Sequence, residues 1–163
     1  MIRRAQPTDI DAIRALIAQL DYEPPPNLEE KILRHSTHPD EVLLVYQLDA
    51  APQLVTGYQL DATIVGFLSL HFIPQIALAG DFARISYFAV DNKARSHGVG
   101  RELEAYITTL ARERNCDRIE VHCHSRRADA HRFYERQGYE ESPKYFTKRL
   151  DDTGHFGPPD TGQ

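Results

Sequence analysis

The sequence predicts one domain of the α/β or α+β class. Apolar runs of strand length alternate with stretches whose apolar residues recur at helical spacing. One such run, residues 84–90, leads through a glycine-bearing turn into a long amphipathic pattern. The 163 residues suffice for a single domain with a proper core.

The N-terminal part is predicted to hold a strand over residues 2–5 and two helices. The first helix begins with Thr8 as its cap and Asp11 three residues later. Residues 23–26, which include three prolines, break it, and Asn27 caps a second helix over 28–36. The apolar positions of the first helix recur at helical spacing and are Ile10, Ile13, Leu16, Ile17 and Leu20.

Strand patterns follow over residues 41–47, 55–60 and 63–72, and the last of these is the strongest. The next segment, residues 73–81, is an unusually apolar loop. It either covers a site or packs on the sheet.

The strand over 84–90 is followed by the glycine turn and a helix that ends near Asn115. A strand over 118–123, a helix over 127–137 closed by Gly138, and strands over 139–141 and 144–150 complete the domain, which spans residues 1–150. Residues 151–163 are rich in Gly, Pro and Asp and are predicted to be a disordered tail. The predicted buried stripe of the helix after the turn is Val99, Leu103, Tyr106, Ile107, Leu110 and Ala111.

The composition is that of an ordinary globular protein, with 41% hydrophobic and 26% charged residues. A net charge of −5 argues against a nucleic-acid partner. No apolar run reaches the ~20 residues that cross a membrane, and the N-terminus lacks a signal-peptide core. We therefore expect a cytoplasmic protein with no membrane partner. Two cysteines are too few for a disulfide framework, and His122 and His124 lack a third ligand, so no metal site is expected.

The most informative segment is the turn R-S-H-G-V-G-R over residues 95–101. Glycines bring backbone amides close to a ligand, and the first turn of a helix carries unpaired N–H groups that attract phosphate. The segment is not a P-loop, and Leu103 stands where a dinucleotide fingerprint has its third glycine. The remaining pattern is R-x-x-G-x-G, formed by Arg95, Gly98 and Gly100.

A second motif, A-D-A-H-R-F-Y-E-R-Q-G-Y over residues 128–139, lies about 30 residues downstream. Together the two motifs resemble the GNAT superfamily of N-acetyltransferases, and the resemblance covers roughly residues 1–150. It implies a mixed, mostly antiparallel twisted sheet flanked by helices, and acetyl-CoA (acetyl-coenzyme A) as cofactor.

The resemblance also implies cofactor contacts. The amides around Gly98 to Arg101 hold the pyrophosphate, and the strand before the turn meets the pantetheine through its backbone. Arg127 stands where the family often has an asparagine, and it either binds cofactor or acceptor or faces solvent. The expected cofactor-binding residues are Phe88, Val90, Arg95, Ser96, His97, Gly98, Val99, Gly100, Arg101 and Arg127.

By the same resemblance, Tyr134 is the general acid that protonates the leaving thiolate, or else it only packs against the cofactor. The general base is missing, because residues 84–90 carry no carboxylate. Ser86 stands at a plausible equivalent position and could hold a water, and His124 is an outside candidate.

The expected function is acetyl transfer from acetyl-CoA to a primary amine of a small molecule or peptide. A non-catalytic acyl-CoA sensor is the alternative, motivated by the missing carboxylate. A homodimer is compatible with the resemblance, but no residue decides it.

Overall fold

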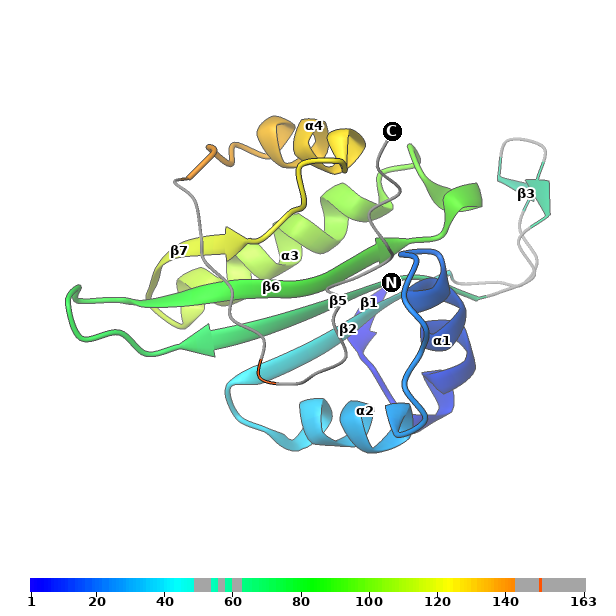
Figure 1. Ribbon diagram of the computed structural model, residues 1–163, viewed down its shortest axis with the longest axis horizontal. Coiled ribbons are helices and arrows are strands. Elements are labelled where there is room, and N and C mark those ends of the chain that lie inside the picture. The colour runs from blue at the N-terminus through cyan, green and yellow to red at the C-terminus, as the bar shows by residue number, and fades with distance from the viewer. Residues whose placement is uncertain (49–53, 56–57, 60–62, 143–149, 151–163) are drawn as a thin grey trace. The chain divides into compact units, whose positions relative to one another are not determined.

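The computed structural model describes residues 1–48, 54–55, 58–59, 63–142 and 150, and the chain forms two compact units, Met1–His122 and Cys123–Gln163 (Figure 1). The first unit contains a five-stranded sheet in the order β1-β2-β5-β6-β7. All neighbouring strands are antiparallel except β6 and β7, which are parallel. The predicted mixed, mostly antiparallel sheet is confirmed. Its strands are β1 (Ile2–Arg4), β2 (Glu41–Gln47), β5 (Ile64–Ile73), β6 (Asp81–Val90) and β7 (Cys116–Val121).

Three α-helices cover the two faces of this sheet (Figure 1). Helices α1 (Ile10–Ala18) and α2 (Leu28–Thr37) lie on one side, and α3 (Val99–Glu113) lies on the other. Strand β5 is buried along nearly all its length because both of its faces are covered. Between α1, α2 and the sheet the core includes Ile13, Leu16, Ile32, Val45 and Phe67.

Gly66 permits close packing of α3 on the sheet. A Cβ placed at Gly66 would lie 3.2 Å from Leu103 Cδ1 and 3.3 Å from Val99 Cγ1 and from the Ala89 carbonyl oxygen. Any side chain there would push the helix away from β5 and β6.

Helix α1 begins differently from the prediction. Residues Pro7–Asp9 form a 3-10 turn, η1, and Asp9, not Thr8, precedes α1. The buried carboxylate of Asp9 accepts the Gln6 amide at 2.8 Å, which fixes the start of the turn. The helix also ends at Ala18, although Leu20 beyond it is buried as expected.

One predicted buried position is wrong, and the structure disfavours one of the two alternatives for the apolar loop. Tyr106 of α3 is 41% exposed, and Glu104 is buried in the predicted stripe instead, where it accepts a hydrogen bond from Thr108 at 2.8 Å. The loop between β5 and β6 does not pack on the sheet through its apolar tip, because Ile76 and Leu78 are exposed.

Short elements depart most from the sequence prediction. The strand expected over 55–60 is two short strands, β3 (Leu54–Val55) and β4 (Tyr58–Gln59), in a sheet of their own. The expected end of that strand at Leu60 lies outside the described residues, as do residues 144–149 of the last predicted strand and the predicted tail at 151–163.

In the second unit the only described helix is α4 (Ala128–Arg136), followed by Gly138 with a φ of 86°. Residues 139–141 are not a strand. The Tyr139 amide donates to the Tyr134 carbonyl at 3.0 Å and its ring lies 5.3 Å from that of Tyr134, so the segment folds back on its own helix.

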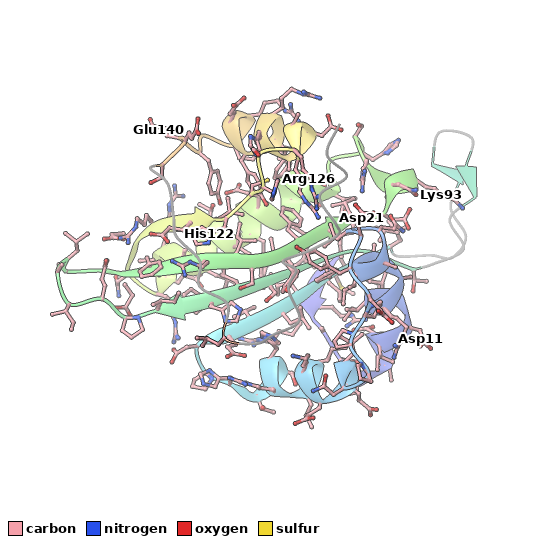
Figure 2. The ribbon with its side chains drawn as sticks, viewed as in Figure 1. Asp11, Asp21, Lys93, His122, Arg126 and Glu140 are labelled. Carbon is pink, nitrogen blue, oxygen red and sulfur yellow. The ribbon has the colours of Figure 1, made fainter. Side chains whose placement is uncertain are left out.

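Most charged side chains point to solvent, as Asp11 and Lys93 do in Figure 2. Among the described helices, none combines the length and apolar character that crossing a membrane requires.

Candidate active site

The glycine turn forms the predicted start of a helix. After β6, Asn92–Ala94 make a 3-10 turn, η2, and Gly98 adopts a φ of 87° immediately before α3. That left-handed conformation favours glycine. The amides of the first turn of α3 have no partner within the helix, so the turn presents N–H donors and the positive end of the helix dipole.

Helix α1 anchors this turn. The Gln19 side chain donates to Asp91 Oδ2 at 3.0 Å and accepts the Asn92 amide at 2.9 Å. Asp91 Oδ1 accepts the Lys93 amide at 2.9 Å. The strand end and the turn are therefore fixed by side chains before any ligand binds.

The predicted phosphate contacts fall into three groups. Arg95, Ser96 and His97 are exposed on the turn, and Arg95 Nε donates to the Val90 carbonyl at 3.2 Å. Val99 is buried, so only its backbone amide can meet a ligand. The remaining turn residues, Gly98, Gly100 and Arg101, lie at the exposed or half-buried start of α3.

Strand β6 runs past its described partner β7 toward this turn. It pairs with β5 along its length, but its parallel pairing with β7 ends at Ile85 opposite Val121. At the same point the register shifts, since Leu70 pairs with Ile85 and Ser69 with Tyr87, which leaves Ser86 as a bulge. From Ser86 to Val90, a stretch that includes Phe88, no described strand pairs with β6 on the β7 side.

A pocket of about 410 Å³ opens on the other side of the same strand. It lies between α1, the segment after it, α2 and the sheet. Tyr87 of β6 and Ser69 of β5 line it together with apolar side chains of α1 and the core. The remaining lining residues include Ile13, Ile17, Tyr22, Glu23, Leu28, Lys31, Ile32, Arg34, His35, Glu41, Leu43, Phe67 and His71.

Tyr87 contributes a protonated hydroxyl group at the pocket. Burial raises the pKa of Tyr87 above its usual 10, and Tyr22 adds to the effect. The two rings meet edge to face, with centroids 5.7 Å apart.

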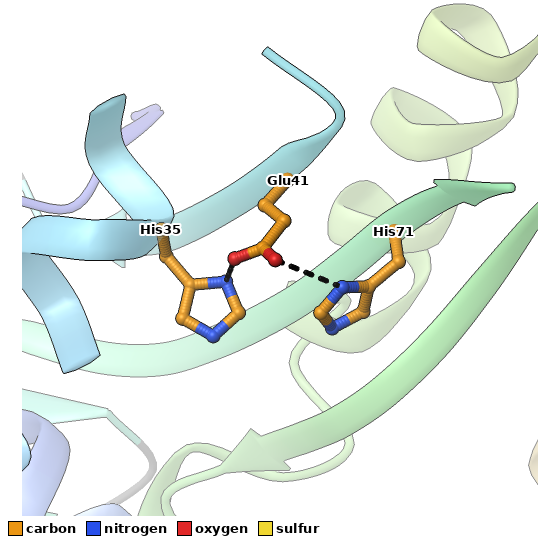
Figure 3. Close-up of side chains that lie close together, drawn as sticks. All are labelled: His35, Glu41 and His71. Carbon is orange, nitrogen blue, oxygen red and sulfur yellow. Dashed lines mark ion pairs between the residues drawn. The ribbon is translucent and has the colours of Figure 1, made fainter. Parts of the chain in front are cut away.

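Three titratable side chains meet in the pocket: His35, Glu41 and His71 (Figure 3). His35 Nδ1 lies 3.0 Å from Glu41 Oε2, and His71 Nδ1 lies 4.0 Å from Glu41 Oε1. Burial lowers the pKa of both histidines below 6.5, and the Glu41 carboxylate only partly opposes this. Burial therefore favours the neutral form of both rings.

Sequence reasoning missed this cluster. Its members come from the last turn of α2, the first residue of β2 and the far part of β5. No short-range motif joins them, and only the pairing of Glu41 with His71 in the sheet brings them together.

The predicted catalytic residue lies in the second unit. Tyr134 is half-buried on α4, and its ring centroid lies 5.3 Å from that of Phe133 and 5.3 Å from that of Tyr139. Arg127 precedes α4, and its carbonyl accepts the amides of Ala130 and His131.

The outside candidate for the base, His124, has a local structural contact. Its Nδ1 accepts the Arg126 amide at 3.3 Å, and its carbonyl accepts the Arg127 amide at 2.9 Å. These bonds shape the start of α4.

Residues 16–139 match the model of the acetyltransferase (GNAT) family. The chain belongs to this family. The match runs from the end of α1 through both sequence motifs, so it includes the phosphate-type turn, all of β6 and α4.

One curated relative and two solved structures are similar to this chain. The aminoalkylphosphonate N-acetyltransferase of Salmonella typhimurium is 34% identical over 87 residues, 53% of this chain. The match spans only 56% of that relative's own length.

Both solved structures share the fold. A transcriptional regulator from Bacillus halodurans C-125 superposes with a TM-score of 0.74 at 23% identity, covering 92% of this chain and 99% of the other. AAC(6')-Iy, in complex with the bisubstrate analogue CoA-S-monomethyl-acetylneamine, gives a TM-score of 0.74 at 14% identity, with coverages of 93% and 97%.

Proposed function

We propose that the protein transfers the acetyl group of acetyl-CoA to the primary amine of a small molecule held in the pocket. One observation carries the proposal. On β6 the described pairing with β7 ends at Ile85, while Tyr87, two residues further along, lines the pocket. A peptide-like pantetheine paired with β6 beyond Ile85 would bring its thioester next to the acceptor.

The cofactor would lie along β6 beyond Ile85, toward α3. Backbone amides of Gly98, Val99, Gly100 and Arg101 would bind the pyrophosphate, with Arg95, Ser96 and His97 as secondary contacts and Arg127 as a further candidate. Phe88 and Val90 would meet the pantetheine through their backbone groups.

The reaction is a direct attack. The neutral amine nitrogen forms a bond to the thioester carbonyl carbon, the C–S bond breaks, and Tyr134 gives its hydroxyl proton to the leaving thiolate. The extra proton on the attacking nitrogen passes to water, and water returns a proton to the Tyr134 phenolate. The ammonium form of the amine first loses its proton to water, because the only carboxylate of β6 is Asp81 at its far end. Ser86, at the bulge, is a candidate to hold that water.

The acceptor class follows from the pocket's size and charge. About 410 Å³ suits a small molecule. Lys31 and Arg34 line it beside Glu23 and Glu41, so a molecule with an amine and an anionic group would find partners for both of its charges there. The relative named for aminoalkylphosphonates supports the same class.

Release of free thiol from acetyl-CoA, measured with a panel of amines, tests the proposal. The panel holds an aminoalkylphosphonate, an alkylamine of equal length and a short peptide. We expect the aminoalkylphosphonate to give the highest kcat/KM. Absence of thiol release with every amine would contradict the proposal.

A pocket variant locates the acceptor. Ile17→Trp fills part of the pocket, and we expect it to raise the KM for the amine by about tenfold, which corresponds to roughly 1.4 kcal/mol. Ala15→Trp adds the same ring on the exposed side of α1 and should leave KM unchanged. Equal KM values for the two variants would place the acceptor elsewhere.

The sensor alternative is favoured by the absence of a carboxylate from residues 82–90 of β6. A sensor would bind acetyl-CoA saturably, yet no amine would release thiol. The same panel therefore separates the two functions.

A further inference from the structure

The cluster of His35, Glu41 and His71 is built on rigid elements. Glu41 and His71 are directly paired across β2 and β5, and His35 comes from the last turn of α2 (Figure 3). Their side chains are 12%, 26% and 23% exposed, in the order Glu41, His71, His35. All three line the pocket, so they are shielded from bulk solvent but open to a ligand.

Their donor atoms converge on a common point. One donor atom from each residue lies within 4.8 Å of the other two. Ligands around one metal ion at bond lengths of about 2.1 Å lie roughly 3.0–3.5 Å apart. The 3.0 Å from His35 Nδ1 to Glu41 Oε2 already meets this, and the 4.0 Å from His71 Nδ1 to Glu41 Oε1 would shorten when an ion binds.

The closest atoms in the cluster lack a hydrogen bond. His35 Nδ1 and Glu41 Oε2 are both buried, and neither makes a hydrogen bond of acceptable geometry with the described residues, although they lie 3.0 Å apart. A nitrogen lone pair and a carboxylate oxygen at that distance repel each other unless a proton or a cation lies between them.

Ser69 helps to orient the third ligand. Its Oγ lies 3.4 Å from His71 Nε2, while Nδ1 of the same ring faces Glu41. A hydrogen bond on the outer ring nitrogen is how proteins orient metal-binding histidines. Arg34 Nη2 competes for Glu41 Oε1 at 3.6 Å, but this side chain is 72% exposed and can move into solvent.

We propose that His35, Glu41 and His71 bind one divalent transition-metal ion, such as Zn²⁺ or Co²⁺, in the pocket. Two imidazoles and one carboxylate suit these ions, whereas Mg²⁺ and Ca²⁺ prefer oxygen ligands throughout. Three protein ligands leave positions open toward the pocket. An oxygen of the acceptor's anionic group takes one of them, and this second part alone rests on the proposed function.

Metal titration of the untagged, full-length protein tests the site. After treatment with a chelator, the protein is titrated with Co²⁺ by visible absorption and with Zn²⁺ by calorimetry. We expect one ion per chain with saturable binding. Glu41→Gln and His71→Gln should each weaken Zn²⁺ binding by more than about 100-fold, since even loss of an outer-shell partner costs ~10–100-fold.

His38→Gln is the matched control, because His38 lies one residue beyond α2, is exposed, and is not in the cluster. It should bind Zn²⁺ as the parent does. Circular dichroism confirms that each variant is folded, and His35→Gln replaces any variant that is not. Absence of saturable binding in the parent, or unchanged binding in the folded cluster variants, would overturn the site.

Adding an aminoalkylphosphonate to the Co²⁺ form tests the open position. Its visible spectrum should change, and an alkylamine of equal length should not change it. An unchanged spectrum would overturn the acceptor contact alone. Metal binding without thiol release would contradict the proposed function but support the metal site. Thiol release without metal binding would support the proposed function and contradict the metal site.

Discussion

At the residue scale, Asp9 shows how one buried charge is stabilised. Arg3 donates to both of its carboxylate oxygens, at 2.7 and 2.8 Å, and the Gln6 amide adds a third bond at 2.8 Å. Burial favours the neutral acid, but these hydrogen bonds outweigh it and hold the pKa of Asp9 below its usual 3.8. Asp9 therefore stabilises the fold above about pH 4, and this contribution is lost as the pH falls below that value.

Asp9→Asn should lower the free energy of unfolding by about 1–3 kcal/mol at pH 7, because it removes a charged partner of Arg3. The difference from the parent should shrink at pH 3, where the parent carboxylate is becoming protonated. Urea unfolding at both pH values measures this. Asp21→Asn is the control, since Asp21 is exposed with a φ of 64° that asparagine tolerates. A loss that is equal at both pH values would contradict the account of Asp9.

Tyr134→Phe should lower kcat by about tenfold to a thousandfold with little change in acetyl-CoA affinity, because it removes only the proton donor. Thiol-release kinetics and cofactor titration measure the two quantities. Tyr139→Phe removes a hydroxyl from the neighbouring ring and should retain turnover. Full activity of Tyr134→Phe would reduce this residue to a packing role.

Single residues also mark the limit of sequence reasoning. The role of Gly98 was predictable, because a glycine before an amphipathic helix allows a tight turn of the backbone. Its φ of 87° confirms this. The cluster at His35, Glu41 and His71 was not, since lone polar residues at the ends of elements carry no periodic signal. Residue type alone favours Thr8 as the helix cap. In the structure Asp9 precedes α1, and Asp9 is held there by its contact with Arg3.

At the element scale, long periodic segments were the most predictable. The strand over 41–47 is found with those bounds, and α2 differs from its prediction by one residue. The bulge at Ser86 and the early end of the β6–β7 pairing were not predictable, because both depend on which strands become neighbours. The strand predicted over 139–141 is not formed, because a segment with a strand pattern also needs a neighbouring strand to pair with.

Packing of α3 on β5 gives a prediction at this scale. Gly66→Ala should destabilise the fold, and Gly66→Val should do so more strongly, by about 1–3 kcal/mol, because the added atoms meet the Ala89 carbonyl and two buried side chains of α3. Denaturant unfolding measures the series. Equal stability of Gly66→Val and the parent would show that α3 can shift without cost.

At the scale of the whole molecule, the candidate site forms only when several elements of the chain pack together. Helix α1 contributes to the pocket and, through Gln19, also holds the turn that precedes α3. Strand β6 extends beyond its described pairing with β7 at Ile85, and its Tyr87 lines the pocket. The sequence motifs indicated the cofactor side of this arrangement, but the acceptor side has no motif, because residues from α1, α2 and several strands form it together.

Calorimetric titration with acetyl-CoA tests the central claim most directly, with ADP as a ligand that has the pyrophosphate but no pantetheine. The account predicts saturable binding at one site in the micromolar range for acetyl-CoA and much weaker binding for ADP, because the β6 edge would hold the pantetheine. Absence of acetyl-CoA binding at millimolar concentration would mean that the turn at Gly98 is only structural, and it would contradict the proposed acetyl transfer.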